Sequence, residues 1–316
     1  LSASISARDG LLLALAVVCV SASAPLIAAC DAPSLAIAMY RCLLAAGLTA
    51  GWMLVTSRRI RLPAGAGVAA GIEVIALHVM IGDQEYAEGV DISSMQVAQA
   101  LRSSVPVTTS RPAPAAFLEA YERAAAAGAT EIVSTHLSGA LSSTFSGAQL
   151  AARSASVPVT VVDSRALGMA MGYAVQAGAR RAAEGAPGQE VAELIERTAL
   201  ASSTVFYVDT LEFLRRGGRI GRASALLGSA LAIKPILALD EGQIVPLEKV
   251  RTASKAIARL EELAVAAAQK AGARVEIAVQ HLDSEERARL LAERLSARVA
   301  TRTDRVEVVE LGAVVG

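Results

Sequence analysis

Two short segments rich in hydroxyl side chains are the first places where this sequence gathers groups able to bind a ligand. They span residues 107–112 and 138–144, and we expect each to be a loop that leads into a helix. Their candidate ligand-binding residues are Thr109, Ser110, Ser138, Ser142 and Thr144. Hydroxyls and free backbone N–H groups at a helix N-terminus bind a carboxylate or phosphate without a fixed positive charge. The alternative is that these side chains only cap their helices.

A basic, glycine-rich segment over residues 214–222 is the second candidate site. It brings together Arg215, Arg216, Gly217, Gly218, Arg219 and Arg222. Glycines allow a partner's backbone to approach closely, and arginine forks bind phosphates and carboxylates. The segment therefore predicts a phosphate site or a docking surface for an acidic partner, with a solvated turn as the alternative.

Catalysis has little support in the residue pattern. The chain has no G-x-S-x-G, H-E-x-x-H or Walker A motif. His136 comes just after a predicted strand and beside the second hydroxyl segment. It is therefore a candidate ligand-binding residue. It is also the nearest histidine that could act as the base for a serine nucleophile. We expect no enzyme, no catalytic residue and no cofactor, with a serine-dependent acyl hydrolase as the less favoured alternative.

Composition excludes further classes. The 316 residues carry 30 basic and 30 acidic side chains, so no net positive field attracts nucleic acid. Aromatic residues make up 3%, too few for base-stacking platforms. The three cysteines, Cys19, Cys30 and Cys42, all precede residue 43, so the rest of the chain has no disulfide or thiolate metal site. This favours a cytoplasmic location.

The amino-terminal part is far more apolar than the rest. Residues 11–30 carry no charge, and residues 34–55 are interrupted only by Arg41. About 20 apolar residues are enough to cross a bilayer as a helix. We expect residues 1–61 to form an apolar, membrane-associated helical hairpin through residues 11–55. A signal peptide cleaved near residues 21–24 and a buried soluble hairpin are the alternatives.

The pattern changes near residue 62. Residues 62–71 read as a linker, and from residue 72 strand, loop and helix patterns alternate. This alternation predicts an α/β fold, a mainly parallel sheet flanked by helices, in two lobes of residues 72–163 and 164–316. Ligands of such sheets bind at the carboxyl ends of the strands.

Two resemblances follow from ordered sets of motifs. Residues 12–55 resemble the first two helices of EamA-type drug/metabolite transporters. The matching motifs are Ser-Ala-Pro-Leu-Ile at 23–27 and Ala-Ile-Ala-Met-Tyr-Arg at 36–41. Such transporters have about ten helices, so these two do not imply transport. Residues 71–316 resemble the DegV family. The matching motifs are Leu-His-Val at 77–79, Glu-Gly-Val-Asp-Ile at 88–92, Thr-Ser-Arg-Pro at 109–112, Leu-Ser-Ser-Thr-Phe at 141–145, Val-Asp-Ser at 162–164, the segment 211–235 and Val-Arg-Thr at 250–252.

The DegV resemblance implies a carrier that holds one long-chain fatty acid in an apolar slot between two lobes. Thr109 and either Ser142 or Ser138 would hold the carboxylate. Arg251 and residues 215–222 match positions near the head group or the partner surface, the partner being a fatty acid kinase in bacteria that have one. A membrane-anchored or transport-linked protein is the alternative function.

The sequence departs from the family pattern at two places. A first strand ending in Thr-Asp-Ser is not found, and neither is a His-x-Gly-Pro-Gly segment after the last strand. We therefore expect a fusion, a gene-model artefact or a truncated chain, with impaired support of the kinase step.

Overall fold

A computed structural model places part of the chain. It describes residues 72–103, 105–226, 233–271, 274–303 and 305–312. The chain divides into two compact units, residues 1–59 and 60–316, and every described residue belongs to the second unit. The expected hairpin over residues 1–61 and the linker over residues 62–71 lie outside the described residues. Of the helices in the described part, none is long and apolar enough to cross a membrane.

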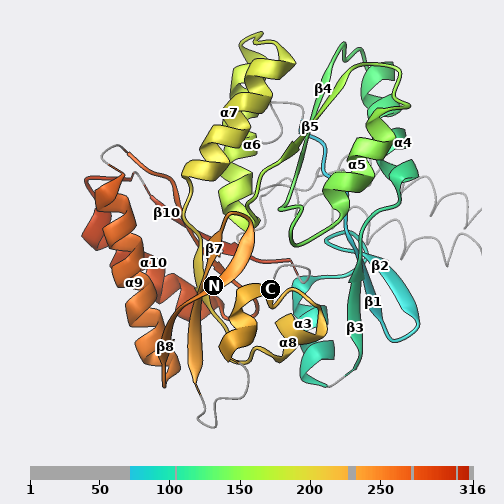
Figure 1. The fold of residues 1–316 in the computed structure, drawn as a ribbon. Helices are drawn as coiled ribbons and strands as arrows, with labels where there is room; N and C mark the ends of the chain where they lie inside the picture. The colour runs from blue at the N-terminus through green and yellow to red at the C-terminus, as the bar shows by residue number, and fades with distance from the viewer. Residues whose placement is uncertain (1–71, 104, 227–232, 272–273, 304, 313–316) are drawn as a thin grey trace, which may run out of the picture. The chain divides into compact units, whose positions relative to one another are not determined.

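Strands and helices alternate along the described residues, which confirms the α/β class (Figure 1). The strands are β1 (His78–Ile81), β2 (Gln84–Ala87), β3 (Val107–Ser110), β4 (Ile132–His136), β5 (Val159–Asp163), β6 (Val205–Tyr207), β7 (Lys234–Asp240), β8 (Gln243–Val250), β9 (Ile277–His281) and β10 (Val306–Glu310). The helices are α3 (Ser94–Arg102), α4 (Pro114–Ala126), α5 (Thr144–Ala152), α6 (Gly168–Ala183), α7 (Gly188–Ala201), α8 (Glu212–Arg216), the 3-10 helix η1 (Gly221–Leu226), α9 (Ala253–Lys270) and α10 (Glu285–Val299).

The strands form small separate sheets, and the expected mainly parallel sheet is wrong for the described residues. β1 pairs antiparallel with β2 and β3, and β7 pairs antiparallel with β6 and β8. Parallel pairs are β4 with β5 and β9 with β10. The reason is the length of the connections. Two residues, 82–83 and 241–242, join β1 to β2 and β7 to β8, and a turn this short joins only antiparallel strands.

Helices cover both faces of the β4–β5 pair. Figure 1 shows α4 and α5 on one side and α6 and α7 on the other. Phe117 and Tyr121 of α4 pack with Val161 of β5, while Ile195 of α7 packs with Val162 of the same strand. Helices α6 and α7 thus pack against strands that precede them in sequence. The expected lobe boundary between residues 163 and 164 stays a prediction.

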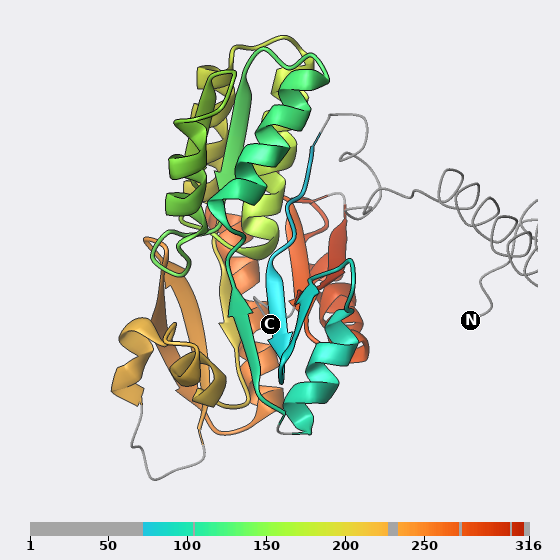
Figure 2. The same cartoon turned by 90° about the vertical axis from the view of Figure 1, so that its right-hand side faces the viewer.

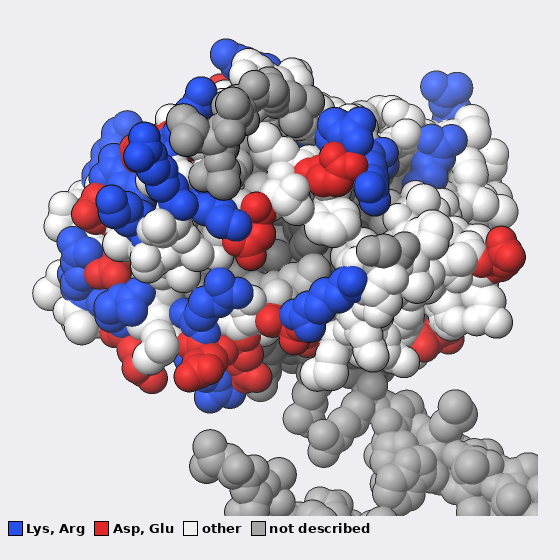
Figure 3. All heavy atoms as spheres, turned by 90° about the horizontal axis from the view of Figure 1, so that it is seen from below, with Lys and Arg blue, Asp and Glu red and all other residues white. Residues whose placement is uncertain are grey.

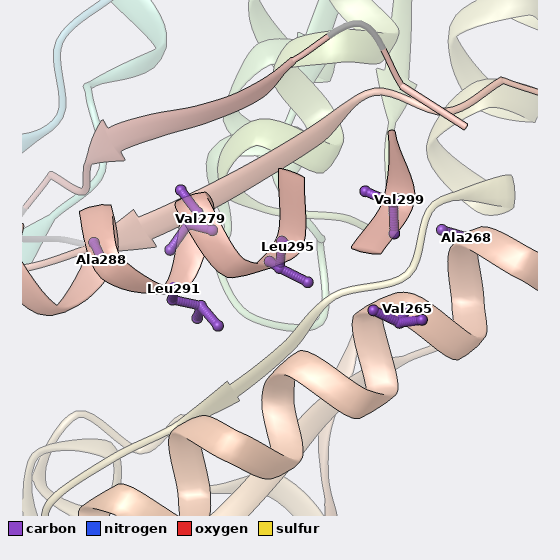
Figure 4. Close-up of a cluster of buried hydrophobic side chains, with 8 residues drawn as sticks. Val265, Ala268, Val279, Ala288, Leu291, Leu295 and Val299 are labelled. Atoms are coloured by element: carbon purple, nitrogen blue, oxygen red, sulfur yellow. The ribbon is translucent and has the colours of Figure 1, made fainter. Parts of the chain in front are cut away.

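A second layer consists of β9 and β10 with α9 and α10. Figure 4 shows valine, leucine and alanine side chains of α9, α10 and β9 converging on one apolar cluster. At its border the carboxylate of Glu261, 9% exposed, accepts hydrogen bonds from Arg294 at 2.7 Å and Arg298 at 2.8 Å. Two charge-assisted bonds therefore join α9 to α10.

Besides the sheet of β6, β7 and β8, the other layer is β1, β2 and β3 with α3, drawn in cyan to blue-green in Figure 2. Val79 of β1 is fully buried against Val97 of α3. Helix α3 begins where Ser93 and Gln96 form a reciprocal capping box. This layer carries β3, on which the first hydroxyl segment lies.

Candidate functional site

The second hydroxyl segment lies at the carboxyl end of a parallel strand, as the sequence predicts. Residues 137–143, the hydroxyl loop, connect β4 to α5. The carboxylate of Asp163, at the end of β5, accepts hydrogen bonds from the backbone N–H groups of Gly139 and Arg165, each at 3.0 Å. A Cβ on Gly139 would lie 2.8 Å from this carboxylate. A larger residue at position 139 would therefore force the Asp163 carboxylate to shift.

Ser138 is buried in the contact between this loop and the turn joining β7 to β8. Its side chain is 1% exposed, and its hydroxyl donates to the backbone carbonyl of Gly242 at 2.7 Å. The same oxygen accepts from the backbone N–H of Ala140 at 3.2 Å. A hydroxyl has one proton, so Ser138 donates to the protein's own backbone here.

Thr144 is the opposite case. It is the first residue of α5, is 2% exposed, and its hydroxyl is the buried side-chain polar atom for which the described residues offer no hydrogen-bond partner. Ser143, at the N-cap position, makes no side-chain cap. Ser142 is half-buried, and its oxygen accepts from the N–H of Thr144 at 3.4 Å. Among the described residues, the start of α5 thus holds an unpaired hydroxyl beside backbone N–H groups that the N-cap residue Ser143 does not cap.

His136 is the last residue of β4 rather than the residue after it, and it faces α4. Its ring lies edge-on to Phe117, with centroids 5.3 Å apart. Tyr121 donates to the hydroxyl of Ser134 at 2.8 Å, and that hydroxyl contacts Nε2 of His136 at 2.9 Å. Ser134 can accept from Tyr121 and still either donate to Nε2 or accept from it, so the direction of the Ser134–His136 hydrogen bond follows the tautomer of His136. Burial lowers the pKa of His136 to about 4, partly offset by the Asp163 charge.

The first hydroxyl segment is not a loop, which corrects the sequence prediction. Residues 107–110 form β3, because they pair antiparallel with β1. Thr109 lies opposite the buried Val79 and is half-buried, whereas Ser110 is exposed. Within the described residues, no hydrogen bond joins either side chain to the hydroxyl loop.

The basic segment is partly helical rather than a simple turn, because Glu212–Arg216 form α8. Arg215 and Arg216 both contact the carboxylate of Glu212, with N–O distances of 2.7 Å. These hydrogen bonds lower the pKa of Glu212 to about 2. Gly217 and Gly218 follow, and Gly218 has a φ of +72°. The single negative charge of Glu212 thus balances one of the two positive charges of Arg215 and Arg216.

Another arginine of the candidate set, Arg219, contacts the hydroxyl loop. Nε of Arg219 donates to the carbonyl of Leu141 in the hydroxyl loop at 3.1 Å. Leu141 also packs into the apolar cluster that contains Ala223 and Leu237. Arg222 and Arg251 are exposed. Figure 3 shows both basic and acidic side chains around a hollow near the centre of one face. The structure therefore brings the basic segment and the hydroxyl loop together.

Three contributors to this junction are not among the candidate residues predicted from the sequence: Gly242, Asp163 and Leu141. Asp163 lies at the end of a strand and Gly242 in a turn. Neither position reveals a partner far along the chain. Among the described residues, no group of histidine, cysteine, aspartate or glutamate side chains has the arrangement of a metal site.

A family model described as an uncharacterised protein of the DegV family matches residues 54–316. The chain belongs to the DegV family. The match begins before residue 71, where the sequence motifs had placed it. The proposed likeness of residues 12–55 to transporter helices falls outside the described residues.

Individual DegV proteins agree with this assignment. A DegV domain-containing protein of Streptomyces coelicolor is 52% identical over 263 residues, which are 83% of this chain and 92% of that protein. A solved DegV family protein of Thermus thermophilus, described as fatty acid binding, has a TM-score of 0.72 and 32% identity, covering 80% of this chain and 90% of that one. The DegV fatty acid binding protein of Bacillus subtilis has a TM-score of 0.70 and 31% identity, covering 78% and 88%.

Proposed function

We propose that this DegV protein is a carrier that binds one long-chain fatty acid between its lobes. The observation that carries the proposal is the buried hydroxyl of Thr144, which has no partner among the described residues and lies at the start of α5, where Ser143 makes no side-chain cap. A ligand carboxylate gives this donor an acceptor, and the helix N-terminus stabilises the negative charge. Burial of the acyl chain contributes about 0.8 kcal/mol per CH₂. The fatty acid binding of the related Thermus and Bacillus proteins supports the same ligand class.

We assign no catalytic step to the site. A serine hydrolase needs a base hydrogen-bonded to its nucleophile. Nε2 of His136 instead contacts Ser134, on the α4 side of the strand, and not Ser138 or Ser142. This arrangement supports a binding role for the hydroxyl loop and opposes the acyl hydrolase alternative.

The experiment that tests the carrier function is mass spectrometry of lipid extracted from the purified full chain, followed by displacement of a fluorescent fatty acid. We expect about one fatty acid per chain, and displacement by oleic acid but not by methyl oleate. The ester keeps the acyl chain and removes the carboxylate, so equal displacement by both would refute a carboxylate site. A folded protein that carries no lipid and takes none up would refute the carrier function.

A fatty acid kinase is the partner we propose, through the exposed Arg222 and Arg251. Guanidinium groups suit an acidic partner surface or a phosphate. We expect Arg222→Ala and Arg251→Ala to lower kinase-dependent phosphorylation of bound oleate while oleate affinity stays the same. Arg197→Ala, on the surface of α7, is the matched control. Unchanged phosphorylation in both site variants would refute this docking surface.

We also propose a cytoplasmic location, because a fatty acid kinase would meet the carrier there. Membrane association through residues 11–55 stays a prediction.

A further inference from the structure

The contact between the hydroxyl loop and the β7–β8 turn has a property that a simple packing contact lacks. The turn residues Glu241 and Gly242 both have positive φ angles, 48° and 79°. This is the geometry of a tight hairpin turn of type I′. A Cβ on Gly242 would lie 2.4 Å from the Ser138 hydroxyl oxygen and 3.3 Å from Cβ of Arg165. The tip of the hairpin therefore fits closely between Ser138 and Arg165.

The chemistry of this contact matches that of a ligand head group. The carbonyl oxygen of Gly242 is an acceptor, as a carboxylate oxygen is, and it takes the single proton of Ser138. Ser138 is 1% exposed and Thr144 is 2% exposed, so a ligand atom reaches either hydroxyl only after neighbouring groups move. At Ser138 the neighbouring group is the β7–β8 turn. A carboxylate that bound Ser138 would have to displace the carbonyl of Gly242.

We propose that the β7–β8 turn is a built-in competitor of the ligand. It occupies Ser138 in the ligand-free protein and leaves when a fatty acid carboxylate takes the proton. The inference rests on the proposed fatty acid binding and adds a moving part to it. The hydroxyl of Thr144, which has no partner among the described residues, gains an acceptor from the head group, whereas Ser138 exchanges one acceptor for another. The turn thereby links occupancy of the site to the position of the whole β6–β8 sheet.

The Gly242 carbonyl can be observed directly by NMR in the full chain. Gly-Gln pairs occur in this sequence at 188–189 and 242–243. Labelling glycine with ¹³C at the carbonyl and glutamine with ¹⁵N therefore gives two carbonyl-to-amide signals, from Gln189 and Gln243. We expect saturating oleate to shift the Gly242 carbonyl signal, because its hydrogen bond from Ser138 is lost. The signal at residues 188–189 is the internal control and should not move.

A variant shows whether the Ser138 proton is responsible. Ligand-free Ser138→Ala should already have the shifted signal and should not respond further to oleate. Ser202→Ala removes a different serine-to-carbonyl bond, the one to Thr198, and should respond as the natural chain does.

The outcomes separate the two proposals. If the natural chain binds oleate and the Gly242 signal stays in place, the turn does not compete, and only this inference falls. If Ser138→Ala responds to oleate as the natural chain does, the movement does not pass through Ser138, and the inference again falls. If the natural chain does not bind oleate, the carrier function and this inference fail together. The first measurement needs no variant, so it remains decisive if Ser138→Ala misfolds.

Discussion

Replacing Thr144 with valine should move stability and ligand affinity in opposite directions. Valine has nearly the same shape as threonine and lacks the hydroxyl. In the ligand-free protein that hydroxyl is buried without a partner among the described residues. An unpaired buried hydroxyl costs about 1–3 kcal/mol. We therefore expect Thr144→Val to stabilise the ligand-free protein by about 1 kcal/mol or more, which is a rise in Tm of about 2–4 °C per kcal/mol for a unit of this size.

Affinity should fall in the same variant, because the ligand carboxylate loses a hydrogen-bond donor. A hydrogen bond to a charged group contributes about 1.5–3 kcal/mol, so we expect affinity for oleate to drop by about tenfold or more. Thermal unfolding without ligand and displacement of a fluorescent fatty acid measure the two effects.

The matched control is Thr303→Val. Thr303 is also buried, but its hydroxyl donates to the carbonyl of Arg305 at 2.8 Å. This control should lose about 1 kcal/mol of stability and keep its affinity for oleate. The reasoning would be refuted if Thr144→Val were less stable than the natural chain, or if it bound oleate equally well.

Three further predictions concern the scaffold. Hydrogen bonds from two arginines lower the pKa of Glu261. Glu261→Gln should therefore lower the free energy of unfolding in urea by about 1 kcal/mol at pH 7. The difference from the natural chain should vanish as pH falls through the lowered pKa of this carboxyl. Burial lowers the pKa of His136 to about 4. Between about pH 6.5 and pH 4 the folded protein therefore binds fewer protons than the unfolded chain. The free energy of unfolding should decline as pH falls through this window, and it should decline less steeply in His136→Gln. Gly178→Ala should cost about 1–3 kcal/mol in urea unfolding, because its Cβ would lie 2.5 Å from Cγ1 of Ile195, whereas Gly172→Ala, facing a flexible methionine sulfur at 3.2 Å, should cost less.

Local signals in the sequence predicted the long elements well. Helices α3 and α9 each begin at a local signal, since Ser93 and Thr252 cap them. Strand β2, with the sequence Gln-Glu-Tyr-Ala, has no apolar alternation and therefore gives no such signal. It forms because the turn at residues 82–83 brings it against β1. Propensity alone did not identify it, since its stabilisation comes from its partner strand.

The candidate site was predictable in its location but not in its hydrogen bonds. The rule that ligands bind at the carboxyl ends of parallel strands indicated the loop after β4. It did not reveal that Ser138 is paired and Thr144 is not, because that distinction depends on Gly242, which belongs to a distant hairpin. The role of Arg219 was likewise hidden, since a backbone carbonyl such as that of Leu141 leaves no mark in a sequence pattern.

Ser138 and Gly242 are 104 residues apart, which sets an order of events during synthesis. On a ribosome that adds about 5–20 residues per second, β4 and the hydroxyl loop leave the exit tunnel several seconds before the hairpin that completes their contact. During that interval the carbonyl of Gly242 is not available to Ser138. A nascent chain thus presents an open hydroxyl loop, and the finished protein closes it with its own backbone.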